Sequence, residues 1–536
     1  MAVARYGGSR GFADEVYEVM AEGAARRTDD GEVVRLPPTD IRPTEPPQGE
    51  VPSSGGDVER GVPGSGAERG LAERRRGPAE PPPGEQPSAS TDQPPTYGPP
   101  SEAPATPEAP GTAETPGNPE APGTPEPSAE TPPVTIAPPG RKSGKTECPS
   151  TLDCEWMPAA YRTFGKKKDY GNHDRLRSPR RIDYIVIHDT EGSYRGIPSM
   201  VKNPRYVSWH YSIRSKDGHV AQHVRTKDIA WHAGNWDINS RSIGIEHEGY
   251  LARGGTWYTE AMYRSSARLV RYLAAKYRIP LDRAHIIGHD NVPGTTPATV
   301  PGMHEDPGPY WDWARYFALM GAPLKPAKGD TSVIIRPAYD ANRPRFTGCS
   351  SRKRDCKPHG ASTVWLRTAP RDSAPLVDDI GKRLGRDTFY SVYDHSARAS
   401  TGQRYAVAGR SGDWTAIWYL SQKAWFYNPA GARTAIAAKG PLVTPLRDKV
   451  KVYGRAYPER AAYPDKSGYQ PHVPLKYVLR MGQYYSLGFT LPGTYQRAGS
   501  ISPAKHSMIT GKLMYHQIQL GHRVMFVRAS DVRVVP

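Results

Sequence analysis

The sequence contains no long apolar run. No stretch reaches the roughly 18 consecutive apolar residues that a membrane-spanning helix needs. The opening segment, MAVARYGGSRGFADEVYEVMAEGAARR, also lacks the apolar core of a secretory leader, so no signal peptide is visible. Helix-turn-helix, zinc-finger and RNA-binding signatures are missing as well. The sequence therefore predicts no transmembrane segment and no specific binding of nucleic acid.

Cysteine is rare, with 4 residues in a chain of 536. These residues form two close pairs, Cys148 with Cys154 in CPSTLDC and Cys349 with Cys356 in CSSRKRDC. Two short loops that each hold two cysteines predict two local disulfides. A zinc site made of all four is a weaker alternative, because neither pair has the C-x-x-C spacing usual for such a site.

Two disulfides imply an oxidising compartment, and hence export, although no signal peptide is visible. Three explanations are open: the true start of the protein differs from Met1, secretion uses another route, or the cysteines are misleading. We favour the first and expect an extracellular or cell-wall location.

Proline and glycine, 56 and 53 residues in all, are unevenly spread. The segment from about Leu36 to Gly140 consists mostly of Pro, Glu, Ala, Thr, Ser and Gly. Such a segment buries too little apolar surface to offset the entropy lost on ordering. We therefore predict that residues 1–145 form a disordered region, partly of polyproline II conformation.

The charge balance is basic, with a formal net charge of +17 at pH 7. Because the acidic residues lie disproportionately in the Pro-rich segment, the folded part is more basic than this total indicates. A basic surface suits a polyanionic partner such as nucleic acid, a membrane surface or an anionic wall polymer. The alternative is a charge that only improves solubility, and charge alone does not decide between them.

The pattern of apolar residues predicts one α/β domain from about residue 181 to 322, or 146–325 with its lead-in. A buried strand over 182–187 ends at His188, and a helix runs from its N-cap Thr259 to the break at Pro280. The remaining expected elements are a hairpin (209–215 and 219–224), strands near 242–248 and 284–287, and a helix near 310–320. Together they make a mixed sheet flanked by helices.

The C-terminal part changes to short β-rich runs such as VWLRTAPRDSAPLV and HRVMFVRASDVRVV, broken by Gly, Ser, Asp and Pro. Short strands at regular spacing with turn residues between them are typical of small all-β barrels. We predict two barrels, over residues 330–430 and 440–536.

A candidate zinc site lies at the strand ends. His188 closes one predicted strand, His289 closes another, and Asp306 lies on the loop that follows. Imidazole and carboxylate are common zinc ligands, and a catalytic zinc keeps three protein ligands and an open position. The alternative is that a Pro/Gly-rich turn simply carries polar residues. The acid beside His289, Asp290, is expected to fix the loop.

Four motifs follow one another along the chain: IVIHDT, SIGIEHEG, IIGH and HEDPGP. In these motifs and their order, residues 181–322 resemble the zinc-dependent N-acetylmuramoyl-L-alanine amidases of the type 2 fold. The resemblance implies zinc as cofactor, cleavage between the lactyl group of N-acetylmuramic acid and L-alanine, and the ligands His188, His289 and Asp306. It further implies that Trp231 and His232, in AWHAG, face the substrate.

The same resemblance assigns the catalytic carboxylate to Glu246. From the residues alone Glu246 and Glu248 are equivalent, since both lie on one face of a predicted strand. His304 stands where the family often carries Lys, which leaves three alternatives for its role. It acts as a cation that stabilises the developing oxyanion, as a neutral hydrogen-bond donor, or as a metal ligand in place of Asp306.

The C-terminal barrels resemble bacterial SH3-type modules, which implies binding to wall peptide or glycan. Our main hypothesis is a secreted, monomeric wall hydrolase whose partner is peptidoglycan, with anionic wall polymers as a further candidate. A non-catalytic peptidoglycan-binding receptor is the alternative, although the intact set of ligands and Glu246 speaks against it. A basic nucleic-acid-binding protein is a third hypothesis, which a steep salt dependence on DNA would support.

Overall fold

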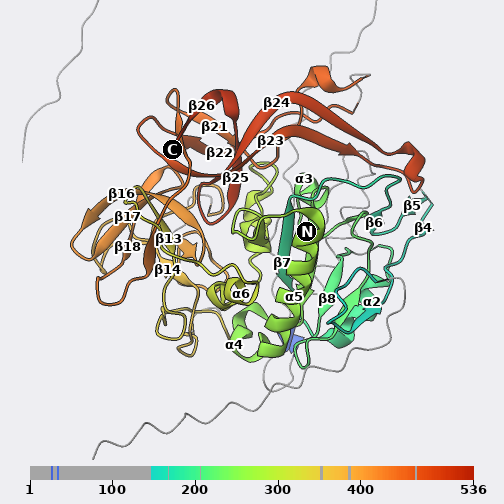
Figure 1. Ribbon diagram of the computed structural model, residues 1–536, viewed down its shortest axis with the longest axis horizontal. Helices are drawn as coiled ribbons and strands as arrows, with labels where there is room; N and C mark the ends of the chain where they lie inside the picture. The colour runs from blue at the N-terminus through green and yellow to red at the C-terminus, as the bar shows by residue number, and fades with distance from the viewer. Residues whose placement is uncertain are drawn as a thin grey trace, which may run out of the picture. The chain divides into compact units, whose positions relative to one another are not determined.

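The chain is described by a computed structural model over residues 146–536, apart from positions 167, 206, 351–353, 384–387 and 465–467 (Figure 1). Before residue 146 it describes two short paired strands, β1 (Arg26–Arg27) and β2 (Val33–Val34). The predicted disordered spacer between Leu36 and Gly140 lies outside the described residues. Among the residues that are described, no helix is long and apolar enough to cross a membrane.

A six-stranded mixed sheet forms the centre of the α/β domain, in the order β12-β7-β11-β8-β9-β3. The first four strands run parallel, β9 is antiparallel to β8, and β3 is parallel to β9. The bounds are β3 (Cys154–Trp156), β7 (Tyr184–Asp189), β8 (Tyr211–Ile213), β9 (Val220–Gln222), β11 (Ser242–His247) and β12 (Ile286–Gly288). This order makes β7 and β12 neighbours whose carboxyl ends lie at the same edge.

Strand β7 is buried along its whole length. Its side chains alternate between the two faces of the sheet. Ile185 and Ile187 belong to the hydrophobic core that includes Leu269 of helix α5 (Glu260–Tyr277), whereas Tyr184 and Val186 belong to a second core. The predicted strand is therefore apolar on both faces because both faces are covered.

Helix α5 covers the first face, as the green helix beside β7 in Figure 1 shows. The Thr259 hydroxyl accepts a hydrogen bond from the Met262 N–H at 3.3 Å, which confirms the predicted N-cap. The helix ends at Arg278, whose backbone is left-handed with φ of 56°. Its buried face includes Met262, Leu269, Val270 and Leu273.

Two disulfides pair Cys148 with Cys154 and Cys349 with Cys356, as predicted.

The remaining elements of the α/β domain are short. The helices are α2 (Ile197–Val201), α3 (Trp236–Asn239), α4 (Gly254–Trp257) and α6 (Trp313–Leu319), and the outlying strands pair β4 (Thr163–Phe164) with β5 (Asp169–Tyr170) and β6 (His173–Asp174) with β10 (Ile229–Ala230).

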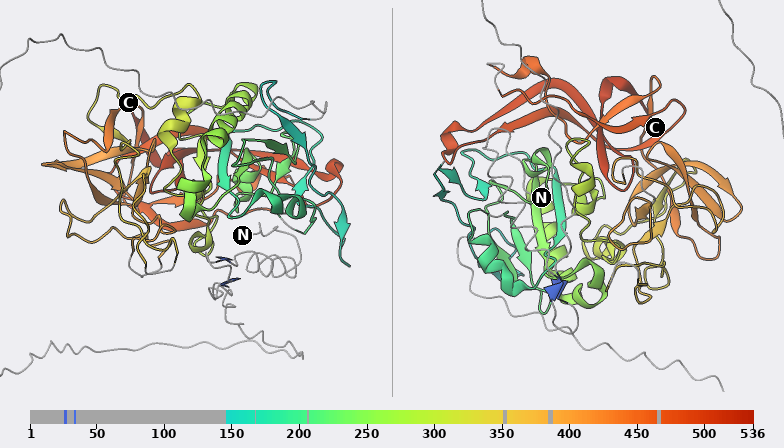
Figure 2. Two further views of the ribbon diagram at one scale, coloured as in Figure 1. Left: turned by 90° about the horizontal axis from the view of Figure 1, so that it is seen from below. Right: turned by 180° about the vertical axis from the view of Figure 1, so that it is seen from behind.

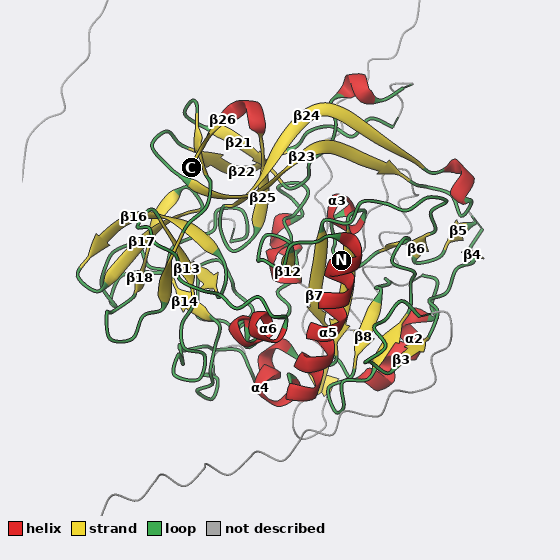
Figure 3. Ribbon diagram, in the orientation of Figure 1, coloured by secondary structure: helices red, strands yellow, loops and turns green. Residues whose placement is uncertain are grey.

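The region after the α/β domain is built from strands, as predicted, and Figure 3 shows helices α2 to α6 gathered in the α/β domain. A five-stranded sheet has the order β18-β17-β16-β13-β19, and β14 pairs with β15. Their bounds are β13 (Ser332–Ile335), β14 (Thr363–Trp365), β15 (Arg398–Ser400), β16 (Arg404–Ser411), β17 (Trp414–Tyr419), β18 (Gln422–Tyr427) and β19 (Ala435–Ala438). The last of these strands ends at Ala438.

A seven-stranded antiparallel sheet follows, in the order β22-β21-β25-β24-β23-β20-β26. Its strands are β20 (Leu442–Pro445), β21 (Val450–Tyr453), β22 (Pro474–Leu479), β23 (Tyr485–Arg497), β24 (Ser507–Gln519), β25 (Val524–Arg528) and β26 (Val532–Val535). Both sheets contribute to one core, with Val333 and Ile417 from the first and Val443 and Ile518 from the second. The SH3-like identity of these sheets stays a prediction.

The seven-stranded sheet covers the second face of the central sheet. Tyr184 and Val186 of β7 share a core with Leu491, Tyr515 and Phe526 of β23, β24 and β25. The long β23–β24 hairpin, red in both views of Figure 2, lies along the α/β domain. The C-terminal region is therefore packed onto the sheet that carries His188.

Candidate functional site

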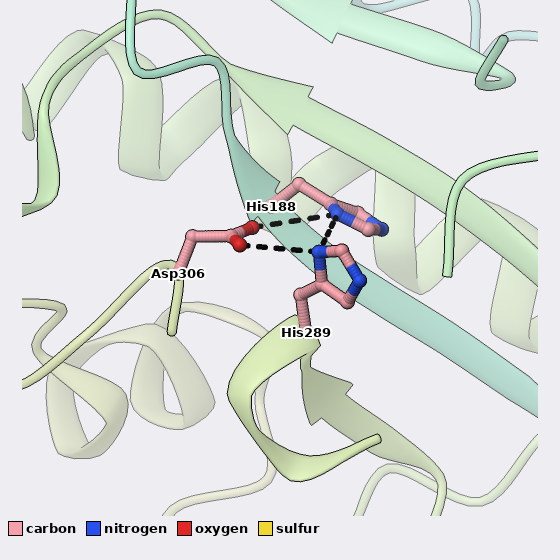
Figure 4. A group of neighbouring side chains, drawn as sticks. All are labelled: His188, His289 and Asp306. Atoms are coloured by element: carbon pink, nitrogen blue, oxygen red, sulfur yellow. Dashed lines mark hydrogen bonds and ion pairs between the residues drawn. The ribbon is translucent and has the colours of Figure 1, made fainter. Parts of the chain in front are cut away.

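Three predicted ligand side chains converge at the carboxyl edge of the central sheet (Figure 4). The Nδ1 atoms of His188 and His289 lie 3.0 Å apart. The Oδ2 of Asp306 lies 3.4 Å from the Nδ1 of His188, and its Oδ1 lies 3.1 Å from the Nδ1 of His289. Among the residues that the structure describes, this is the one group whose ligand atoms could hold a metal ion.

The topology brings the two histidines together. In the parallel pair β7–β12, Ile187 lies opposite Gly288, so that His188 and His289 both follow at the same level of the sheet. His289 is the first residue of a short 3-10 helix (His289–Asn291). Asp306 reaches them from the loop after His289, and its own backbone carbonyl accepts a hydrogen bond from the N–H of Asp290 at 2.7 Å.

The electrostatics of the group suit a cation. Burial, together with the nearby His289, lowers the pKa of His188 to about 4, and burial also lowers the pKa of His289. Burial works against ionisation of Asp306, yet the surrounding histidines hold the pKa of that carboxyl well below its ordinary value. Two neutral imidazoles and an ionised carboxylate are the protonation states in which these side chains bind a metal.

His232 fixes the orientation of His188. The Nε2 of His188 lies 2.9 Å from the Nδ1 of His232, whose Nε2 lies 3.1 Å from the Ser242 hydroxyl. If each ring donates from Nε2, the Nδ1 lone pair of His188 is left facing the ligand cluster. A hydrogen bond from the second ring nitrogen is the usual means of orienting a ligating histidine. The donor set and its support thus fit zinc.

The two residues that the sequence assigned to a substrate-facing wall lie in the interior. Trp231 is 5% exposed and His232 is 8% exposed. The indole N–H of Trp231 donates to Asp174 at 2.8 Å. His232 contacts His188, and Gly244 leaves the space that its ring fills: an added Cβ there would lie 2.6 Å from the His232 Cγ.

Glu246, on β11, lies beside the cluster, with its Oε1 3.8 Å from the Nδ1 of His188. Its Oε2 is buried and, within the described part of the chain, has no hydrogen-bond partner. Burial, and then the negative charges of Asp306 and Asp189, raise the pKa of Glu246 well above its ordinary value. A raised pKa makes this carboxylate a stronger proton acceptor than an ordinary glutamate.

Glu248 is differently placed, although the sequence made it equivalent to Glu246. Its carboxylate accepts the backbone N–H groups of Tyr194 at 2.7 Å and Ser215 at 2.9 Å. Strand β11 ends at His247, so the alternation of faces does not extend to Glu248. This carboxylate ties loops together and does not enter the cluster of His188, His289 and Asp306.

His304 lies at the open side of the cluster. Its ring stacks on that of His289, with centroids 4.4 Å apart and an interplanar angle of 20°. The Nδ1 of His304 is 3.6 Å from an oxygen of Asp306, and its side chain is 37% exposed. The convergent group contains Asp306 and not His304.

Asp189 is a neighbour of the site that the sequence reasoning missed. Its backbone N–H donates to Asp306 at 3.3 Å, and its carboxylate accepts the Tyr258 hydroxyl. Burial, together with Glu191 and Asp306, raises the pKa of Asp189 well above its ordinary value. The available signal was its position directly after His188 at the strand end.

Comparison with known proteins identifies relatives of this part of the chain. The profile of a family described as N-acetylmuramoyl-L-alanine amidase matches residues 178–309. The chain is 35% identical over 153 residues to N-acetylmuramoyl-L-alanine amidase A of Achromobacter lyticus, a match that covers 25% of this chain and 81% of that protein.

Two further matches involve AmpD proteins. The chain is 38% identical over 120 residues to the 1,6-anhydro-N-acetylmuramyl-L-alanine amidase AmpD of Salmonella typhimurium (strain SL1344), covering 21% of this chain and 57% of AmpD. The chain therefore spans just over half the length of that relative. The crystal structure of a selenomethionine AmpD derivative matches with 26% identity and a TM-score of 0.23, covering 31% of this chain and 93% of that one.

The close approach of Gly244 to the His232 ring yields a testable prediction. Gly244→Ala should lower the free energy of unfolding by about 1–3 kcal/mol, the usual cost of overpacking, because the new Cβ meets the His232 ring. Chemical denaturation measures the change. Gly196→Ala is the control, since Gly196 has φ of −75° and its added Cβ would meet nothing within 4 Å. Equal stability of Gly244→Ala and wild type would show that the ring moves aside without cost.

Proposed function

The chain belongs to the N-acetylmuramoyl-L-alanine amidase family, and from this we propose that it is a zinc-dependent peptidoglycan hydrolase. It cleaves the amide bond between the lactyl group of N-acetylmuramic acid and the L-alanine of the stem peptide. The observation that carries the proposal is the convergence of His188, His289 and Asp306 beside the buried Glu246 carboxylate.

His188, His289 and Asp306 would hold zinc. When bound there, zinc supplies Lewis acidity toward the carbonyl oxygen of the amide and lowers the pKa of water. His232 positions His188 through the contact with its Nε2.

Glu246 is the catalytic base. Its buried Oε2 takes a proton from the water that attacks the carbonyl carbon, and then delivers that proton to the leaving nitrogen as the C–N bond breaks. Its raised pKa supports both halves of this role, because a carboxyl with a raised pKa binds the proton more tightly between the two transfers.

His304 contacts the substrate. Its partly exposed ring is stacked over His289 and lies outside the group of ligand atoms, which favours a hydrogen-bond donor to the developing oxyanion over a metal ligand. A neutral imidazole can make this contact, so the role does not depend on the positive charge that the family's usual Lys would carry.

Peptidoglycan is the substrate and partner, and the C-terminal sheets bind wall peptide or glycan in the manner of SH3-type modules. The two disulfides support an extracellular or cell-wall location.

The ligand assignment predicts one zinc per chain in the wild type and none in His289→Ala, which should also be inactive because two ligands cannot hold zinc tightly. Metal analysis of dialysed protein measures the stoichiometry. His285→Ala is the matched control: His285 lies four residues away and contacts Asp282 at 2.7 Å, outside the cluster. Stoichiometric zinc in folded His289→Ala would contradict the assignment.

The assignment of the base predicts that Glu246→Gln keeps zinc and loses about two orders of magnitude or more in rate, the usual scale for a general base. Glu248→Gln removes a carboxylate from the same chain segment and should lose stability while retaining most of the rate per folded molecule. Steady-state release of peptide from peptidoglycan measures both. The reverse ranking would transfer the catalytic role to Glu248.

A further inference from the structure

A histidine of the C-terminal sheet reaches the loop that carries His289. His522 lies between β24 and β25, and its Nε2 is 2.8 Å from the Oδ2 of Asp290, the residue directly after His289. The two residues are 3% and 2% exposed. A buried contact between a carboxylate and an imidazole thus joins two segments that are 232 residues apart in the sequence.

The ring of His522 is held on both sides. Its Nδ1 lies 3.0 Å from the backbone carbonyl oxygen of Arg398, so each ring nitrogen faces an oxygen. The backbone carbonyl of His522 accepts the side-chain N–H groups of Asn291 at 3.0 Å and Gln403 at 2.7 Å. His522 therefore contacts the two consecutive residues after His289, while Arg398 of β15 and Gln403 hold it from within the C-terminal region.

The contact extends to the third ligand. The backbone N–H of Asp290 donates to the carbonyl oxygen of Asp306 at 2.7 Å, so a displacement of Asp290 acts on both ligand-bearing loops. The second loop has its own contacts with the C-terminal region: Lys382 Nζ lies 2.7 Å from Glu305, and Arg523 donates to the His304 carbonyl oxygen at 3.4 Å.

We infer that His522 is a positioning residue for the metal site, acting through Asp290 on His289 and Asp306. The inference rests on the proposed function, since it takes these residues as the zinc ligands. It makes the C-terminal β region a structural part of the catalytic unit, in addition to any wall binding. Removing His522 leaves a buried carboxylate without its partner, and the Asp290 loop must move or admit water to solvate it.

Zinc affinity of the full-length protein tests the inference without relying on catalysis. Metal-free wild type, His522→Ala and His522→Gln are titrated with zinc against a competing chelator. Because the loss of groups that support metal ligands typically weakens metal binding about 10- to 100-fold, we expect a loss of that size in His522→Ala. His522→Gln should recover part of the affinity, since its amide N–H can donate to Asp290.

The matched control is His516→Ala. His516 belongs to β24, is 7% exposed and contacts Thr490 of the neighbouring strand at 2.8 Å, within its own sheet. Both alanine variants should lower the melting temperature, whereas only His522→Ala should weaken zinc binding. A merely structural role of His522 would change the melting temperature alone.

The outcomes are distinct. Folded His522→Ala with wild-type zinc affinity overturns the inference and leaves the proposed function intact. Equal losses of affinity in the His522 and His516 variants also overturn it, because the effect would then follow general destabilisation. Failure of the wild type to bind zinc would overturn the ligand assignment, and the inference with it. If His522→Ala does not fold, His522→Gln decides: unchanged affinity contradicts the inference, and a several-fold loss supports it.

Discussion

Strand β7 is buried on both faces, and the metal site depends on what covers them. Helix α5 packs against Ile185 and Ile187, and the seven-stranded sheet packs against Tyr184 and Val186. With both faces covered, the strand is packed up to its carboxyl end, where His188 lies beside His289, the residue that follows β12. The geometry of His188, His289 and Asp306 is therefore a property of the whole packed unit, from the helix on one side to the C-terminal strands on the other.

The features of local origin could be predicted from the sequence. The apolar run before His188 marks a buried strand, and Thr259 with the helical spacing after it marks α5. Parallel strands place their carboxyl ends together, and this rule alone makes His188 and His289 plausible partners. Asp306 has no comparable signal from a strand end: its residue type and its place on the loop after His289 made it a candidate, and the resemblance to the amidases favoured it over His304.

The features that the sequence could not reveal depend on contacts between distant segments or on where a strand stops. Glu246 and Glu248 differ because β11 ends at His247. Glu248 therefore lies outside the strand, where the alternation of side chains between the two faces no longer applies. The buried position of His232 could not be read from the sequence, because the space for its ring is created by Gly244 on another element. The core that the two C-terminal sheets share is another such contact, since short strands look alike in sequence whether or not they pack together.

The central claim, that the site hydrolyses the bond between the muramic acid lactyl group and L-alanine, is tested most directly by the products. Purified peptidoglycan is digested with the full-length protein, with the protein after chelation, and after zinc is returned, and the new ends are assigned by mass. The account predicts free N-terminal L-alanine on released peptides, glycan strands that keep their lactyl groups, loss of both products on chelation and recovery with zinc. New sugar reducing ends, cleavage within the peptide, or digestion that persists without metal would contradict it.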